Sequence, residues 1–472
     1  MPETPSPLSP SGRILLAKWQ RTLSECEADG DLTSAVSALD RISGLYRQHG
    51  MAAEALQACQ RALVLHDRLG NFGVAAAVLR DMSGLYLALG QYQDAYAMAQ
   101  RAVAVCGRLG DMDATAASIS AACRVLLAMK MYQEALAGLN QALFMREKQN
   151  NLPEITSCLL QIGAVQMQLG SLDEAEATYM RAISLLEGAG DRSQLAEAYY
   201  TAGIVASRQD RESTALERLQ TALRIRQDAG MSPDTGKVMG AIAELYQRQG
   251  NHVAARRMLE QALPPLENGG DLALLAATLV RLGKSLAAQG MLAAALASLS
   301  RALAIGEELG DVGAQSVALN ELGRTYEGQN RLAEALSQYR RALELCKQTE
   351  NRLGVVEALG SCANILDLQG EAEQARELFS QLFTLAEETG DHEACARAYF
   401  VAARSLWRHG DRAGSVAYLE KSVAQHRESG MRRETMRELE RLAASYGEIG
   451  QADKVKAALA EAELLRAQMS RE

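Results

Sequence analysis

The stretch LNELGRTYEGQNRLAEALSQYRRALEL, from Leu319 to Leu345, decides the fold. Its apolar residues recur at helical spacing on both sides of a short break, which predicts two helices joined by a tight turn. Similar stretches recur every 40 residues, eleven times, without an insertion or deletion. The units open at Gly30, Gly70, Gly110, Asn150, Gly190, Gly230, Gly270, Gly310, Glu350, Gly390 and Gly430. A fixed period in this range is typical of a solenoid.

Fixed positions of the unit carry fixed residue types when each unit is numbered from its opening residue. Position 14 is always small, as in Gly323, and positions 26 and 33 are Ala in nine units each, as in Ala335 and Ala342. Position 10 is large and apolar in every unit, and position 17 is often Tyr. Small residues let two helices approach closely, while large apolar residues fill the space beside them. Gly at positions 1 and 21 is expected to end the helices in the left-handed conformation. Each unit is therefore predicted to be helix A, turn, helix B, turn.

The spacing of these small residues, with Tyr three positions after the first of them, resembles the tetratricopeptide repeat. The usual proline after helix B is missing, and an L-G-D or L-G-N link replaces it, as in Leu109 to Asp111. This variant is similar to the 40-residue subclass of Pins/LGN-type adaptors and of some bacterial regulators. The resemblance covers residues 30–469. It implies an all-α, right-handed superhelical solenoid of eleven helix-turn-helix repeats, with helix A lining the concave face.

The two ends and one irregular unit divide the chain further. We expect residues 1–10 to be a disordered tail and residues 11–29 to form a capping helix, with Trp19 as its anchor on unit 1. Residues 30–269 hold units 1–6 and residues 270–469 hold units 7–11. Pro264 and Pro265 are expected to end helix B of unit 6 early. They make either a bend near residues 264–270 or a local kink. The last helix either caps the array itself or docks against another chain, so the protein is expected to be a monomer or a dimer through this end.

Composition narrows the classes of function. The formal net charge of −9 argues against non-specific nucleic-acid binding, which depends on neutralising phosphates. No apolar run approaches the roughly 20 residues of a membrane span, and the N-terminus lacks a signal-peptide pattern. The eight cysteines form no C-x-x-C pair and are interpreted as buried, reduced thiols, which fits a cytoplasmic location.

The sequence offers no catalytic constellation. The pair His392 and Cys395 lies three residues apart on one expected helix, but no orienting acid accompanies it. Glycines serve as helix punctuation, so Gly-rich matches indicate no phosphate site. We therefore expect no enzyme activity, no metal and no cofactor.

The expected inner wall carries the best candidate site. Position 15 reads Lys284, Arg324, Asn364 and Arg404 in units 7–10. Neighbouring inward positions add Arg281, Asn320, Arg397 and Phe400. In an acidic chain, four successive basic or amide residues predict a ladder that binds the carboxylates and backbone of an extended partner. The alternative is a solvated surface. Pins/LGN-type repeats carry Asn at this position, and here only Asn364 keeps it, which puts the same ligand in doubt.

Two functions follow from this ladder. The first is a scaffold or adaptor that holds an extended, partly acidic segment of another protein or peptide in its concave groove. The second is a regulatory sensor, in which a bound peptide or small ligand changes the superhelix and switches an effector protein.

Overall fold

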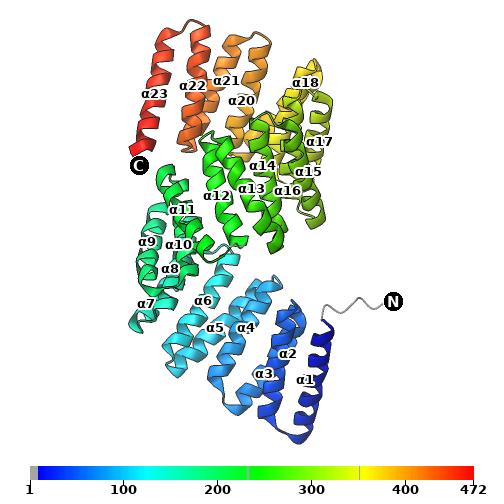
Figure 1. Ribbon diagram of the computed structural model, residues 1–472, viewed down its shortest axis with the longest axis vertical. Helices are drawn as coiled ribbons and strands as arrows, with labels where there is room; N and C mark the ends of the chain where they lie inside the picture. The colour runs from blue at the N-terminus through cyan, green and yellow to red at the C-terminus, as the bar shows by residue number, and fades with distance from the viewer. Residues whose placement is uncertain (1–8, 231–232, 350, 472) are drawn as a thin grey trace, which may run out of the picture. The chain divides into compact units, whose positions relative to one another are not determined.

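A computed structural model of the chain describes residues 9–230, 233–349 and 351–471. They form 23 α-helices, which fall into two compact units divided between Val205 and Ala206 (Figure 1). The first compact unit spans several repeats. It contains α1 (Pro10–Asp29), α2 (Leu32–Gln48), α3 (Ala52–Leu69), α4 (Phe72–Ala88), α5 (Tyr92–Leu109), α6 (Met112–Ala128), α7 (Tyr132–Lys148), α8 (Leu152–Gln168), α9 (Leu172–Ala189) and most of α10 (Arg192–Arg208).

The second compact unit contains the remaining helices. They are α11 (Glu212–Asp228), α12 (Pro233–Arg248), α13 (His252–Gly269), α14 (Leu272–Ala288), α15 (Leu292–Leu309), α16 (Val312–Gly328), α17 (Leu332–Gln348), α18 (Arg352–Leu368), α19 (Ala372–Thr389), α20 (His392–Arg408), α21 (Arg412–Glu428), α22 (Arg432–Glu448) and α23 (Ala452–Arg471). From α11 to α23 each helix packs against the next, and several A helices of neighbouring repeats also touch, as α14 touches α16 and α18 touches α20. The predicted all-α helix-turn-helix array is confirmed, while its handedness stays a prediction.

Every A-to-B turn is built in the same way. The backbone N–H of position 22 donates to the carbonyl of position 17, as from Arg331 to Tyr326 at 2.9 Å, which is the closing bond of a Schellman-type cap. The residue at position 21 has a positive φ, as predicted for Gly50 at 71°. Lys130, Asp210 and Asn330 take the same conformation without being glycine. The tight connection therefore imposes this backbone even where the sequence does not favour it.

At most links between repeats an Asp or Asn side chain caps the next helix, although Asn71 and Asn151 do not. Asp31 and Asp311 accept hydrogen bonds from the backbone N–H groups of Ser34 and Ala314, at 3.1 and 3.0 Å. These bonds satisfy donors that the first turn of a helix leaves unpaired. The L-G-D link thus ends one helix with Gly and starts the next with Asp.

The A and B helices of a unit meet through a small residue. A Cβ atom added at Gly323 would lie 2.5 Å from the ring of Tyr339, and one added at Gly163 would lie 2.6 Å from the ring of Tyr179. Both tyrosines are fully buried, as is Ala335 in the facing helix. The small residue at position 14 therefore provides the space that position 30 fills.

The ends and the irregular unit differ in how they match expectation. Helix α1 covers unit 1, and Trp19 packs beside a cluster that contains Leu23 and Leu39. The predicted early end of helix B in unit 6 is wrong, because α13 continues to Gly269 with Pro264 and Pro265 inside it. A bend near residues 264–270 stays a prediction. The expected tail falls largely on residues 1–8, which lie outside the described residues.

Turn geometry predicts that Lys130→Gly stabilises the protein. A non-glycine residue in the left-handed region destabilises the folded state by about 1–2 kcal/mol. Glycine removes this strain, but it also raises the entropy of the unfolded chain, so only part of the difference becomes stability. We expect a higher urea midpoint for this variant. Asn330→Gly is the matched control, with a smaller gain because Asn tolerates the conformation better. A lower midpoint for Lys130→Gly would show that its side chain contributes more than the turn costs.

The helix contact predicts that Gly323→Ala destabilises the protein by about 1–3 kcal/mol, because its methyl group would overlap the ring of Tyr339. Replacing Gly323 or Ala335 by the larger Leu should cost more. Gly84→Ala is the control, since Gly84 is helical and an added Cβ meets nothing within 4 Å. That variant should gain up to about 1 kcal/mol from helix propensity. Urea unfolding measures both, and equal effects at the two sites would contradict the packing argument.

Candidate functional site

The predicted ladder lies along one cavity of the second compact unit. Lys284, Arg324, Asn364 and Arg404 come from α14, α16, α18 and α20, and all four line a cavity of about 520 Å³. The repeat places them there, because position 15 follows the buried position 14 in each successive A helix. Their alignment is a consequence of the constant unit length, and the side chains face a shared space.

The four neighbouring residues are divided. Arg397 and Phe400 line the same cavity, whereas Arg281 and Asn320 are not among its lining residues. Arg281 instead pairs with Glu244, at 2.9 Å between Nη2 and Oε2. Asn320 is buried, so it does not offer its amide to a groove.

Carboxylates that the sequence analysis overlooked neutralise part of the ladder. Glu321 forms ion pairs with Lys284, at 3.3 Å, and with Arg324. Its own side chain is only 11% exposed. Arg397 pairs with Glu393 and lies 3.7 Å from Glu357. Lys284 and Arg324, the first two residues of the expected ladder, are therefore engaged in internal ion pairs, although both line the cavity.

Asn364 is fixed from two sides. Its Nδ2 donates to Glu327 at 3.0 Å, and its Oδ1 accepts from Arg408 at 2.9 Å. Glu327 also accepts from the hydroxyl of Tyr339 at 3.2 Å, and burial raises the pKa of that tyrosine. This network connects the cavity wall to the tyrosine that fills the helix contact of unit 8.

Arg408 has a strong partner beside this network. It donates to Asp367, which also accepts from His409 and from Ser405, at 2.5, 2.6 and 2.9 Å respectively. Burial would raise the pKa of Asp367, but the hydrogen bonds from His409, Arg408 and Ser405 outweigh it and hold the pKa below its usual value. Asp367 is thus ionised and forms an ion pair with the guanidinium of Arg408.

Arg404 differs from the other members of the ladder. Its side chain is exposed, and its guanidinium makes no ion pair or hydrogen bond with the residues that the structure describes. It also lines a second cavity of about 550 Å³, together with Phe400, Trp407, Leu419 and Arg441. The open charge of the ladder is therefore concentrated at its α20 end.

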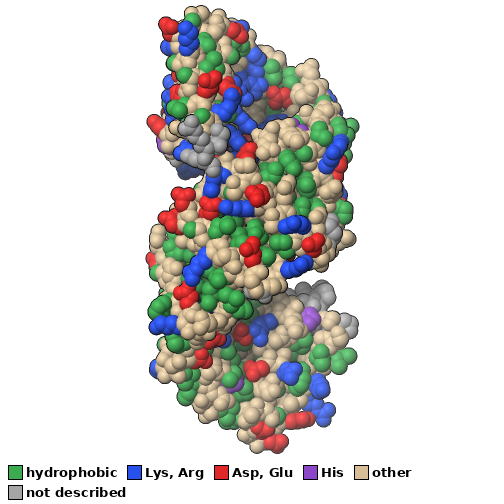
Figure 2. Space-filling model, turned by 60° about the vertical axis from the view of Figure 1, so that its left-hand side comes forward, with side chains coloured by type: hydrophobic (Ala, Val, Ile, Leu, Met, Phe, Trp, Pro, Cys, Tyr) green, Lys and Arg blue, Asp and Glu red, His purple; other side chains and the backbone are tan. Residues whose placement is uncertain are grey.

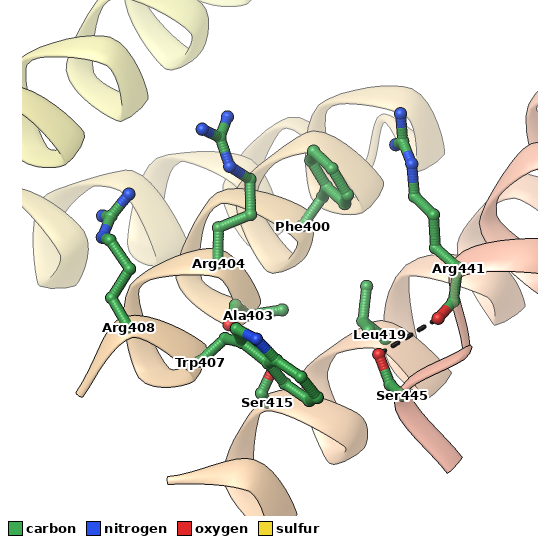
Figure 3. A pocket seen from close by; sticks show the side chains of 9 residues that line it. All are labelled: Phe400, Ala403, Arg404, Trp407, Arg408, Ser415, Leu419, Arg441 and Ser445. Carbon is green, nitrogen blue, oxygen red and sulfur yellow. Dashed lines mark hydrogen bonds between the residues drawn. The ribbon is translucent and has the colours of Figure 1, made fainter. Parts of the chain in front are cut away.

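The second cavity combines charge with an apolar floor. Figure 3 shows the side chains of Arg404 and Arg441 rising on the same side, with Phe400 between them. The guanidinium carbon of Arg441 lies 4.8 Å from the centre of the Phe400 ring, a cation–π distance. Space-filling shows Lys and Arg side chains gathered at the height of α20–α22 (Figure 2). This arrangement suits a ligand that carries a carboxylate next to an apolar group.

Sequence reasoning missed Arg441 because it followed the basic ladder only as far as unit 10. Arg441 stands at position 12 of unit 11, the same inward column as Arg281 in unit 7. Extending that column by one more unit would have found it. Glu321 stands at position 12 of unit 8, so the same column also places this acid on the wall, although its pairing with Lys284 and Arg324 needed the structure.

Other chemistry finds little support in the geometry. Nδ1 of His392 lies 2.9 Å from Gln425, whereas the thiol of Cys395 donates to the carbonyl of Ala386 at 3.2 Å. Burial raises the pKa of Cys123 and Cys362 to about 11, which keeps these thiols protonated. Within the part of the chain that the structure describes, His, Cys, Asp and Glu form no group of three or more suited to a metal ion.

Comparison with known proteins bears on the repeats. A model of the tetratricopeptide repeat matches residues 155–228 and 274–348. None of the curated proteins matches the sequence. Among the helices of residues 9–230, 233–349 and 351–471, none combines the length and hydropathy that crossing a bilayer needs.

Several solved structures share the fold at low identity. A STAND-family ATPase with a tetratricopeptide repeat sensor from Pyrococcus horikoshii has a TM-score of 0.53 at 13% identity, over 80% of this chain and 63% of that one. A Rap protein complexed with Competence and Sporulation Factor has a TM-score of 0.50 at 14% identity, over 76% of this chain and 99% of that one. The apo form of RapI has a TM-score of 0.50 at 12% identity, over 75% and 98%. The family model, the repeat period and the helix packing agree that residues 155–228 and 274–348 hold tetratricopeptide repeats, and the solved structures share the fold.

Proposed function

We propose that the chain is an interaction protein that holds an extended, partly acidic segment of a partner protein or peptide against the inner face of α14–α22. One observation carries this proposal. Residues from four successive A helices line one cavity, and Arg404 at its end has a guanidinium without a partner among the described residues. An exposed charge that no internal group satisfies is available to a ligand.

The two cavities divide the work of recognition. In the first cavity, Glu321 already forms ion pairs with Lys284 and Arg324. A ligand there would gain little binding free energy from charge and would depend more on shape complementarity. In the second, Arg404 and Arg441 offer guanidinium groups beside Phe400. Guanidinium–carboxylate pairs are charge-assisted and directional, so they fix the register of a chain that has no fold of its own. We therefore place the strongest contact at α20 and α22.

The alternative is a regulatory sensor. The Rap protein whose fold is similar was crystallised with Competence and Sporulation Factor, so a solenoid of this kind is compatible with holding a factor. The Pins/LGN-type subclass remains a finer part of the adaptor proposal, supported by the repeat length and by Asn364. Absence of catalysis and a cytoplasmic location remain expectations.

Arg404→Glu should weaken the binding of deca-glutamate at least about tenfold, because a charge-assisted bond of about 1.5–3 kcal/mol is replaced by repulsion. Arg324→Glu should also weaken it, but less, since Glu321 already pairs with Arg324. Isothermal titration calorimetry at low salt measures the affinity. Thermal stability should stay nearly unchanged in Arg404→Glu, because no described residue loses a partner.

Arg341→Glu is the matched control. Arg341 lies on α17, pairs with Glu307 at 3.0 Å and belongs to a B helix. Arg301, paired with Glu267 on α13, offers a second control of the same kind. Both reversals change the net charge as Arg404→Glu does, and they should alter the affinity less than twofold. Equal losses in all three variants would show that only the overall charge matters and would overturn the proposed site.

A further inference from the structure

One face of α22 carries three arginines at helical spacing, and only one of them belongs to the site described above. Arg433, Arg437 and Arg441, which we call the α22 row, follow each other at intervals of four residues and therefore lie along one side of the helix. Arg441 lines the second cavity. The other two contact helices from the beginning of the same compact unit.

Arg433 forms an ion pair with Glu212, the first residue of α11, at 2.5 Å between Nη1 and Oε1. The two side chains are only 15% and 18% exposed. Arg437 donates to the backbone carbonyl of Arg248, the last residue of α12, at 3.2 Å, although 189 positions separate the two. We call these two contacts the latch.

The latch departs from the general rule for repeat proteins, in which each repeat contacts only its neighbours. Helices α11 and α12 belong to units 5 and 6, whereas α22 belongs to unit 11. The receiving side is itself held in place. Arg248 donates to Asp210 at 2.5 Å and to the hydroxyl of Ser207 at 2.9 Å, which fixes the turn before Glu212.

The latch also has the chemistry of the proposed ligand. Glu212 presents a carboxylate to Arg433, and the carbonyl of Arg248 presents a backbone acceptor to Arg437. An extended acidic segment would offer the same two groups. The rise of about 1.5 Å per residue puts Arg441 about 12 Å from Arg433 along the helix, a length that about four extended residues span.

We propose that the latch is an internal competitor for an acidic segment on the α22 row, and that binding of such a segment at Arg441 and Arg404 releases Glu212 from Arg433. This proposal rests on the proposed function of the α20–α22 site. It adds that the chain's own α11 occupies part of the row until a partner takes its place. Binding and opening are then coupled, and each must affect the other by the same factor.

The first experiment tests the latch without a ligand. Spin labels at Gln220→Cys on α11 and Glu434→Cys on α22, both exposed positions, report the separation of the two helices by double electron–electron resonance. A Cys26→Ser background removes the one cysteine that is not buried. We expect a single narrow distance in this protein and a longer, broader distribution after Arg433→Glu, which sets two carboxylates against each other.

The control for this variant is Arg427→Glu. Arg427 pairs with Glu461 of α23 in the adjoining unit, at 2.6 Å, and both side chains are more exposed than those of the latch. This reversal should leave the distance distribution unchanged. If Arg433→Glu also leaves it unchanged, the ion pair does not hold the helices together and the proposal is wrong.

The second experiment tests competition. Deca-glutamate should shift the distances toward those of Arg433→Glu, and deca-lysine should not. Glu212→Gln, which removes the internal carboxylate without touching the row, should bind deca-glutamate about fivefold more tightly or better. If deca-glutamate binds and the distances stay the same, the coupling is overturned while the proposed site stands. If deca-glutamate does not bind at all, both the proposed function and the coupling fail. The distances measured for Arg433→Glu then still show whether the ion pair holds the two helices together.

Discussion

The close approach of two helices through a small residue is the constraint on which this structure depends. At position 14 a glycine such as Gly323 leaves no room for a Cβ atom, because the ring of Tyr339 fills the space. Where position 14 is Ser83, the facing position 30 is Ala99 instead. Position 14 is small in every unit, so the A and B helices can approach closely along the whole array. Protein interiors are packed too densely to allow much variation here.

A constant repeat length and a constant turn place equivalent residues of successive A helices in register. Position 21 takes the left-handed conformation even at Lys130, so the turn does not change with sequence. As a result, equivalent positions of successive A helices face the same space. This regularity is how Lys284, from α14, and Arg404, from α20, come to line one cavity although 120 residues separate them in the chain.

Electrostatics then decides which part of that wall carries charge without an internal partner. Glu321 is largely buried and holds both Lys284 and Arg324, so it offsets the charge of two steps of the ladder. Removing one partner of such a pair leaves a charge uncompensated in a poorly solvated place. No acid among the described residues pairs with Arg404 or Arg441, and Phe400 between them provides an apolar surface. The same helix that presents Arg441 also presents Arg433 to Glu212, which connects the site to units 5 and 6.

The sequence by itself determined the helical repeat, its turns and the helix that precedes the first repeat. Those features depend on local propensity and on a strict period, and both are visible in the columns. It also led to one error, the early end of α13, since that helix runs through Pro264 and Pro265 to Gly269, with Pro265 and Leu266 buried. Only the tertiary structure decided that Glu321 pairs with Lys284 and Arg324, that Asn320 is buried, and that Arg433 meets Glu212. These contacts depend on which side chains from different repeats reach the same point in space, and the 40-residue period holds no information about that meeting.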